Sequence, residues 1–536
     1  MTTATLTVLG LMLVLFGSCC YLYLTCSTVD NASFATSGSS SWASNGISEG
    51  TSGELFRAVH VHTFSGERLF AAWKPPSTPA PGRSPCKMWA VITSIFAPTT
   101  TVKQIASLKD WCLVIAGDKK SPREYNVSGE RTHYLSPDAQ ERLPFATSKM
   151  LRWNHFGRKN LGYLYAIEQG ARWVYDTDDD NELQSLAYGI PIPRPSTSVE
   201  EVDTAHPLYN LYPQTSTNPH AWPRGFPLDS IKDNRTFTAA IEPRAWTARR
   251  VGVIQSLADH DPDVDGIYRL TQPLPFVFPA ATAMATMATG AAIPQAADRG
   301  RQLHEFPTRV AGSIGEARRL RGRGIAGGAQ GSGKAGGDGK GSGKASGDGK
   351  GSGEGNAAGR TAASATKFAD KSEPHHYRYR LISLRAGTFM PYNAQATLHG
   401  YESLWGLLLP CTVHGRVADI WRAYFTQRLL WDVGLRTAFS TPWVTQYRNV
   451  HNYLADFNSE LPLYQQAGEL VRVLREWRPM TPSLPGRIEE LYILMYEMGI
   501  LGLNDVKLVQ AWLTDLVKLG YEFPEIGPRT AGWLKD

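Results

Sequence analysis

Apolar runs of strand length alternate with helical repeats in the first ordered stretch of the chain. The predicted strands are 88–95, 111–116 and 172–175. Val102, Ile105 and Leu108 recur at helical spacing between the first two strands, and a second helix over 160–169 ends at Gly170. Strands that alternate with helices predict an α/β fold with a parallel, doubly wound sheet, whose ligands bind beyond the carboxyl ends of the strands.

The pattern changes to long helical repeats toward the C-terminus. Residues 415–434 predict an amphipathic helix, because Val417, Ile420 and Tyr424 fall on one face. Two more helices are expected around Leu491 and between Asn504 and Gly520. We therefore expect a helical C-terminal region over 441–536.

Three segments lack the pattern of a folded core. Residues 6–24 are almost wholly apolar and predict a membrane signal anchor within 1–28, with a cleaved signal peptide as the alternative. The anchor would leave the N-terminus cytosolic and the body translocated. Residues 29–85 are rich in Ser, Gly and Pro and predict a flexible stem, whereas 279–373 carry the repeat GSGKAGGDGK and predict a disordered insert. The folded body would then comprise 86–278 and 374–440.

Composition narrows the class further. The apolar content of 42% suits a globular body, and the net charge of +6 owes much to the insert, so we expect no nucleic-acid binding. Sequons at Asn31, Asn126 and Asn234 are compatible with a lumenal body. Outside the anchor, Cys86, Cys112 and Cys411 allow one disulfide at most.

An acidic cluster, Asp176-Thr177-Asp178-Asp179-Asp180, directly follows the third strand. Adjacent like charges are rarely buried unpaired, so they need a cation or solvent. An EF-hand loop fails because its sixth and twelfth positions would be Asn181 and Ala187. A phosphatase of the aspartyl-nucleophile type fails because Asp180 occupies the position of a small residue. An Asp-x-Asp site that holds Mn²⁺ or Mg²⁺ and a nucleotide diphosphate fits best.

Other residues of the same α/β unit fit such a site. Thr93 and Asp118 lie near the ends of the first two strands, and the basic pair Arg158 and Lys159 enters a helix, where phosphate groups are favoured. Together with Asp176, these residues are our candidates for binding the nucleotide sugar.

Several sequence blocks carry a resemblance to a known family. They are WAVITSIFAP, WCLVIAGDKK, WNHFGRKNLGYLYAIEQGA, VYDTDDDNEL, WPRGFPLDSIKD, DPDVDGIYRL and YNAQATLHGYESLWGLLLPCTVHGRVADIWRAYFTQRLLWDVG. In this order, over 89–271 and 392–434, they resemble the STELLO family, plant Golgi glycosyltransferase-like proteins that associate with cellulose synthase complexes. The Gly/Lys/Asp-rich insert departs from the family's pattern.

The resemblance implies a single-pass type II Golgi membrane protein with a lumenal, GT-A-like (Rossmann-like) domain. It would transfer a sugar from a nucleotide sugar, UDP-linked by expectation, to a glycan or glycoprotein. By this analogy Asp176, Asp178 and Asp180 would bind the metal and the nucleotide sugar. His414 would either complete the metal shell, as a late histidine does in many GT-A enzymes, or be a structural histidine.

The catalytic base is left open by the sequence. An inverting transferase needs a carboxylate to deprotonate the acceptor hydroxyl, and the candidates are Asp419, Asp263 and Asp265. Asp419 could equally pair with Arg422 on a helix surface. The alternative function, from a different class, is a non-catalytic Golgi assembly or trafficking factor for cellulose synthase complexes.

Overall fold

The computed structural model describes residues 86–127, 131–279, 379–448 and 452–527. All of them belong to one compact unit, Phe64–Asp536. The predicted anchor and stem, and almost all of the predicted insert, lie outside the described residues. Within the described ranges, no helix is both long enough and apolar enough to cross a bilayer.

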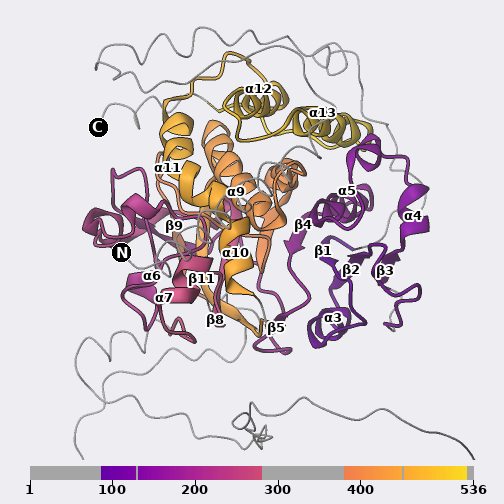
Figure 1. The fold of residues 1–536 in the computed structure, drawn as a ribbon, viewed down its shortest axis with the longest axis horizontal. Coiled ribbons are helices and arrows are strands. Elements are labelled where there is room, and N and C mark those ends of the chain that lie inside the picture. Colours follow the sequence, from indigo (N-terminus) through magenta and orange to yellow (C-terminus); the bar gives the residue numbers. More distant parts are fainter. Residues whose placement is uncertain (1–85, 128–130, 280–378, 449–451, 528–536) are drawn as a thin grey trace, which may run out of the picture. The chain divides into compact units, whose positions relative to one another are not determined.

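A sheet of eleven strands runs through the described part of the chain (Figure 1), in the order β3-β2-β1-β4-β10-β8-β11-β9-β6-β7, with β5 paired to β11. The strands are β1 Met88–Thr93, β2 Trp111–Ala116, β3 Thr132–Leu135, β4 Trp173–Asp176, β5 Asn181–Leu183, β6 Ser198–Val202, β7 Ile241–Thr247, β8 Val251–His260, β9 Leu381–Ser383, β10 Thr397–Gly400 and β11 Arg436–Gln446.

The N-terminal half of this sheet is parallel, as the sequence predicts. β2 pairs with β3 and β1, and β1 pairs with β4, in each case in parallel. The sheet as a whole is mixed, because β10 runs antiparallel between β4 and β8. The chain leaves β1 toward β2 on one side and later returns to β4 on the other. This reversal of strand order is where open α/β sheets bind ligands.

Helices cover both faces of the parallel strands and extend to the C-terminus. They are α3 Thr100–Ala106, α4 Pro137–Glu141, α5 Lys159–Glu168, α6 Tyr212–Thr215, α7 Gly266–Thr271, α9 Gly415–Asp432, α10 Tyr453–Ser459, α11 Leu461–Glu476, α12 Leu484–Glu497 and α13 Leu503–Lys518. α5 ends before Gly170, which has a φ of 89° and supplies the expected left-handed C-terminal residue. α5 also packs closely on β1, since a Cβ on Gly162 would lie 2.6 Å from Val91 Cγ1.

Helix α9 corrects the amphipathic interpretation. The helix is where the sequence predicts it, but every residue from Val417 to Trp431 is buried, including the charged side chains of Asp419, Arg422 and Arg428. It packs against β11, α11 and α12. The polar positions therefore do not form a solvated face, and each needs a buried partner.

The C-terminal helices begin later than expected. β11 continues through Pro442 to Gln446, so it crosses the predicted start of the helical region at 441. α10 to α13 follow, and α12 and α13 lie side by side (Figure 1). α13 also contacts α5, so the C-terminal helices pack on the same unit as the parallel strands. Cys86 and Cys112 form a disulfide, and Cys411 is free and buried.

Candidate functional site

The acidic cluster lies at the carboxyl end of β4. Asp176 is the last residue of the strand and is fully buried, whereas Asp178, Asp179 and Asp180 are half-buried in the loop that leads to β5. β1 ends beside β4, so Thr93 lies at the same edge of the sheet. The cluster therefore occupies the point at which the strand order reverses.

Asp176 is held between two buried cations. Its Oδ1 lies 2.7 Å from Lys159 Nζ, and its Oδ2 accepts a hydrogen bond of 2.7 Å from Arg422 of α9. Burial alone would raise the pKa of Asp176, but Lys159 and Arg422 outweigh it and hold the pKa below its usual value. Asp176 is therefore ionised and fully engaged, and it supports the loop from below.

Lys159 supports the same loop from the start of α5. Its ammonium group donates to the carbonyl oxygens of Thr177 (2.7 Å) and Ala394 (3.1 Å) and to Asp178 Oδ1 (3.0 Å). Burial alone would lower its pKa, but Asp176 and Asp178 raise it, so the side chain is charged. The structure thus places Lys159 and Asp176, which we expected to bind the nucleotide sugar, beneath the loop.

An open cleft of about 390 Å³ lies above this layer. Of the predicted binding residues, it brings together Thr93, Asp118, Arg158, Asp178 and Asp180. Asp179 of the acidic cluster also lines it, as do residues that the sequence did not indicate, namely Ser94, Ile95, Phe96, Ala116, Lys120, Asn154, His155 and Phe156. Lys120 follows Gly117-Asp118-Lys119 directly after the second predicted strand, so its position near the cleft could have been predicted from the sequence. Asn154 and His155 reach the cleft through a loop that no sequence pattern predicts.

Two of the expected binders mainly shape the wall of the cleft. Asp118 accepts hydrogen bonds from the backbone N–H groups of Lys119 (2.7 Å), Asn154 (2.7 Å) and His155 (3.1 Å). It therefore fixes the Asn154 turn, whose φ is 53°. The Arg158 guanidinium donates to Gln140 Oε1 and lies 3.7 Å from the centre of the Trp153 ring.

The exposed part of the cluster is crowded with negative charge. Burial, together with Asp178 and Asp179, raises the pKa of Asp180 to about 7. Burial, with Asp178, also raises the pKa of Asp179, whose carboxylate accepts a short hydrogen bond from Ser94. Asp178 disfavours the charge of both neighbours and Asp179 that of Asp180, so negative charge is concentrated at this wall of the cleft.

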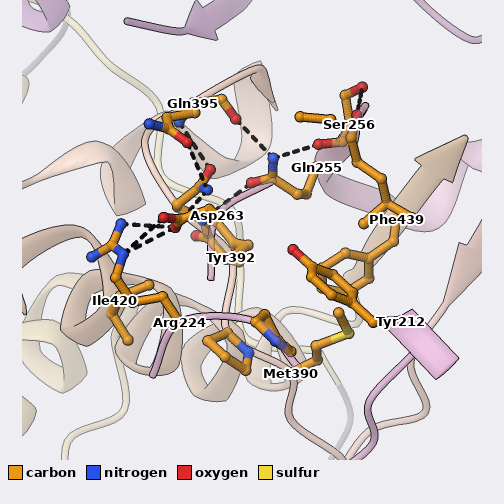
Figure 2. A pocket seen from close by; sticks show the side chains of 15 residues that line it. Tyr212, Arg224, Gln255, Ser256, Asp263, Met390, Tyr392, Gln395, Ile420 and Phe439 are labelled. Carbon is orange, nitrogen blue, oxygen red and sulfur yellow. Dashed lines mark hydrogen bonds and ion pairs between the residues drawn. The ribbon is translucent and has the colours of Figure 1, made fainter. Parts of the chain in front are cut away.

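The three candidate bases lie elsewhere. Asp263 and Asp419 share Arg224, which donates to both carboxylates at 2.8–3.1 Å. Arg224 and Asp263, bonded to each other, both line a cavity of about 20 Å³, which has room for a water molecule but not for a sugar (Figure 2). Asp265 caps α7 through the Tyr268 N–H (2.8 Å) and accepts from Trp222 (2.7 Å). Asp419 does not form the alternative pair with Arg422, because Arg422 pairs with Asp176.

His414 also has a local structural role. It is the N-cap of α9, and its Nδ1 accepts the Arg416 N–H at 3.2 Å. It is exposed and is not among the described residues that line the cleft. Within the described part of the chain, no three His, Cys, Asp or Glu side chains converge as a ready-made metal cage.

Comparisons with known proteins agree with the resemblance read from the sequence blocks. Residues 416–530 match the model of a family described as STELLO glycosyltransferases. The chain is 24% identical over 450 residues to "Probable glycosyltransferase STELLO2" of Arabidopsis thaliana, an alignment that covers 82% of this chain and 46% of that protein. It is 22% identical over 450 residues to "Probable glycosyltransferase STELLO1" of the same plant, covering 82% and 45%.

The chain spans about half the length of these curated relatives. The alignments nevertheless cover most of this chain, and the family model covers α9 through α13, which include the helix that carries Arg422 and Asp419. The resemblance to the STELLO glycosyltransferase family that was recognised from the sequence is thereby confirmed.

Proposed function

We propose that this chain is a metal-dependent glycosyltransferase that transfers a sugar from a nucleotide sugar, UDP-linked by our expectation, to a glycan or glycoprotein. One observation carries the proposal. A cleft at the reversal of strand order in a parallel α/β sheet combines an acidic loop with basic side chains. The order β3-β2-β1-β4 followed by an antiparallel strand also supports the GT-A-like fold that we proposed from the resemblance.

The residues of the acidic loop fit a divalent cation. Asp178 and Asp180 offer hard carboxylate oxygens at one wall of the cleft. Burial raises the pKa of Asp180 most, and Asp178 and Asp179 add to the rise with negative charge that a cation would relieve. Mg²⁺ in enzymes that act on phosphates is typically held by one or two carboxylates plus phosphate oxygens, so a preformed three-residue cage is not required. The ion, Mn²⁺ or Mg²⁺, would supply charge neutralisation at the diphosphate.

The chain's own residues would hold and orient the donor. Lys120 is a cation that lines the cleft. Arg158 is a buried cation in the cleft wall, and burial lowers its pKa to about 10, which leaves it protonated at neutral pH. During transfer, the bond between the anomeric carbon and the diphosphate breaks, and its electron pair leaves with the nucleotide. The acceptor oxygen bonds to the anomeric carbon, and its proton passes to solvent or to the departing diphosphate. Preorganised cations at the diphosphate favour this charge shift.

The rival proposal, a non-catalytic assembly or trafficking factor, has one specific observation in its favour. Asp263, Asp419 and Asp265 are engaged with Arg224 or with the cap of α7, and none of them lines the cleft among the residues described. A chain without a free base would bind the nucleotide sugar and fail to transfer the sugar. Association with cellulose synthase complexes belongs to this rival.

We also propose residence in the Golgi membrane with a lumenal body. The disulfide between Cys86 and Cys112 is typical of proteins that fold in an oxidising compartment. The sequon residues Asn126 and Asn234 are exposed and therefore accessible to glycosylation. The predicted anchor itself lies outside the described residues, and a protease-protection assay on microsomes with an N-terminal tag would test the orientation.

Calorimetric binding of UDP and UDP-sugars to the full chain tests the site. The titrations are run with Mn²⁺ and with a chelator, in the wild type and in Asp178→Asn. We expect metal-dependent binding in the wild type and a loss of at least tenfold in affinity in the variant. A folded wild type that binds no nucleotide sugar would refute the transferase proposal, whereas binding without turnover on an acceptor panel would favour the rival.

A further inference from the structure

A second cavity of about 210 Å³ adjoins the cleft on the side of α3 and β5. The two cavities share Phe96, Asp179 and Asp180, so these residues form the ridge between them. Glu182 and Tyr447 line the second cavity and not the cleft. Any group bound in the second cavity would therefore lie next to a donor bound in the cleft.

The two cavities differ in charge. The cleft contains Lys120 and Arg158 as well as the carboxylates. Of the described residues that line the second cavity, none is basic. It shares Asp179 and the proposed metal ligand Asp180 with the cleft, and Glu182 is a carboxylate that lines the second cavity alone. A diphosphate or an acidic sugar would be repelled there, because like charges within a few ångströms disfavour each other. A neutral, hydroxyl-rich ligand suits the second cavity, because it is not repelled and because carboxylate oxygens accept hydrogen bonds from its hydroxyl groups.

Two exposed aromatic rings at the second cavity offer the apolar surface on which a sugar ring can pack. Phe96 is 50% exposed and Tyr447 is 51% exposed, which is a substantial apolar surface for a solvated position. Tyr447 is held in place, because its N–H donates to the Asp180 carbonyl at 3.3 Å and its ring lies 5.0 Å from that of His260. Pyranose rings present apolar C–H faces that pack on such side chains and remove their area from water.

A buried hydroxyl group without a hydrogen-bond partner also indicates a ligand site. Thr101 forms part of the wall of the second cavity and is 1% exposed, and its Oγ1 has no hydrogen-bond partner among the described residues. Buried polar groups nearly always have a hydrogen-bond partner, so an unpaired one indicates that a ligand or a water molecule supplies the partner. The volume is below the roughly 300–1,000 Å³ of sites that enclose drug-sized ligands, so the cavity fits a single sugar unit rather than a long segment.

We propose that this second cavity is the acceptor subsite and that it takes the terminal, neutral sugar unit of a glycan, with Tyr447 as the stacking platform and Glu182 as a hydrogen-bond acceptor. The inference rests on the proposed function, because the neighbouring cleft must hold the sugar donor. It adds a substrate class to that function, namely neutral rather than uronic-acid acceptors.

The test titrates the full chain, saturated with UDP and Mn²⁺, with short neutral oligosaccharides and with an oligogalacturonide of the same length, by ligand-observed NMR. Each neutral sugar is presented both free and attached to a peptide. The variants are Tyr447→Ala and Glu182→Gln, which lie outside the cleft. Tyr496→Ala on α12 is the matched control, because Tyr496 is 42% exposed and lines neither cavity.

We expect a neutral oligosaccharide to bind whether or not a peptide is attached, and Tyr447→Ala to weaken it about fivefold to tenfold. Glu182→Gln should reduce the difference in affinity between the neutral oligosaccharide and the oligogalacturonide. The control Tyr496→Ala should leave the affinities for both ligands unchanged. The inference is overturned by unchanged sugar affinity in Tyr447→Ala, by preference for the acidic probe, or by binding that requires the peptide. Wild type that binds UDP but no oligosaccharide overturns the inference alone, whereas failure to bind any nucleotide overturns the proposed function.

Discussion

The substitution Asp176→Asn separates the supporting layer of the site from its binding surface. In the wild type, Asp176 meets Lys159 and Arg422 at 2.7 Å each, and all three side chains are buried. Asparagine keeps the shape but leaves two buried cations without the carboxylate between them. Breaking a buried ion pair in this way costs about 3–5 kcal/mol. Asp178, only two residues away, is 25% exposed, and its loss leaves Lys159 with two carbonyl acceptors and Asp176.

We therefore expect a large loss of stability in Asp176→Asn and little change in Asp178→Asn. Asp176→Asn should lower the thermal unfolding midpoint by about 6–10 °C, at the roughly 2 °C per kcal/mol seen for large domains. Asp178→Asn should change the free energy of unfolding by about 0–1 kcal/mol, as a part-exposed pair does. The assay is scanning calorimetry of the full chain with chelator present. An unchanged midpoint in Asp176→Asn would refute the reasoning, as would an equal fall in Asp178→Asn.

Three further predictions concern stability. Burial raises the pKa of Asp265 to about 6, so its contribution is present below about pH 4 and is lost as the pH rises through 6. The fall in unfolding midpoint between pH 5 and pH 8 should accordingly be smaller in Asp265→Asn. Replacing both Cys86 and Cys112 by serine removes a cross-link with a separation of 26 residues, and we expect denaturant titration to show a loss of about 3 kcal/mol. Gly162→Ala should cost about 1–3 kcal/mol by the same titration, because its Cβ would lie 2.6 Å from Val91 Cγ1, and an unchanged midpoint would contradict that packing.

Local patterns predicted the parallel half of the sheet and the place of the acidic loop. β1, β2 and β4 are apolar runs whose burial on both faces leaves a plain signature in the sequence. β10, in contrast, is only four residues, Thr397–Gly400, and includes the buried His399. No run or alternation distinguishes such a strand, and it forms because β4 and β8 flank it on both sides.

The ion-pair partners of the buried charged residues could not be predicted from local sequence patterns. Asp419 and Arg422 are three residues apart, which is the spacing of a surface pair on a helix, yet each pairs with a residue far away in the sequence. Arg224 and Asp176 are those partners, and nothing in the chain near either residue indicates the pairing. The sequence thus predicted the place of the acidic loop, but not that Asp419 lies away from the cleft or that Asp176 and Asp419 are each paired with a buried cation.

The ion pairs around Asp176 and those around Arg224 hold one backbone segment between them, and this gives the candidate carboxylates Asp263 and Asp419 a structural role. Arg422 donates to the Asn393 carbonyl (3.2 Å) and Lys159 to the Ala394 carbonyl (3.1 Å), both from the side of the acidic loop. From the other side, Asn393 donates to Asp263 (2.8 Å), and the Ala394 N–H donates to Asp419 (3.2 Å). Because Lys159 also bonds Thr177 and Asp178, a shift of this segment would move the loop. Asp263 and Asp419 therefore help to position the candidate site through Asn393 and Ala394.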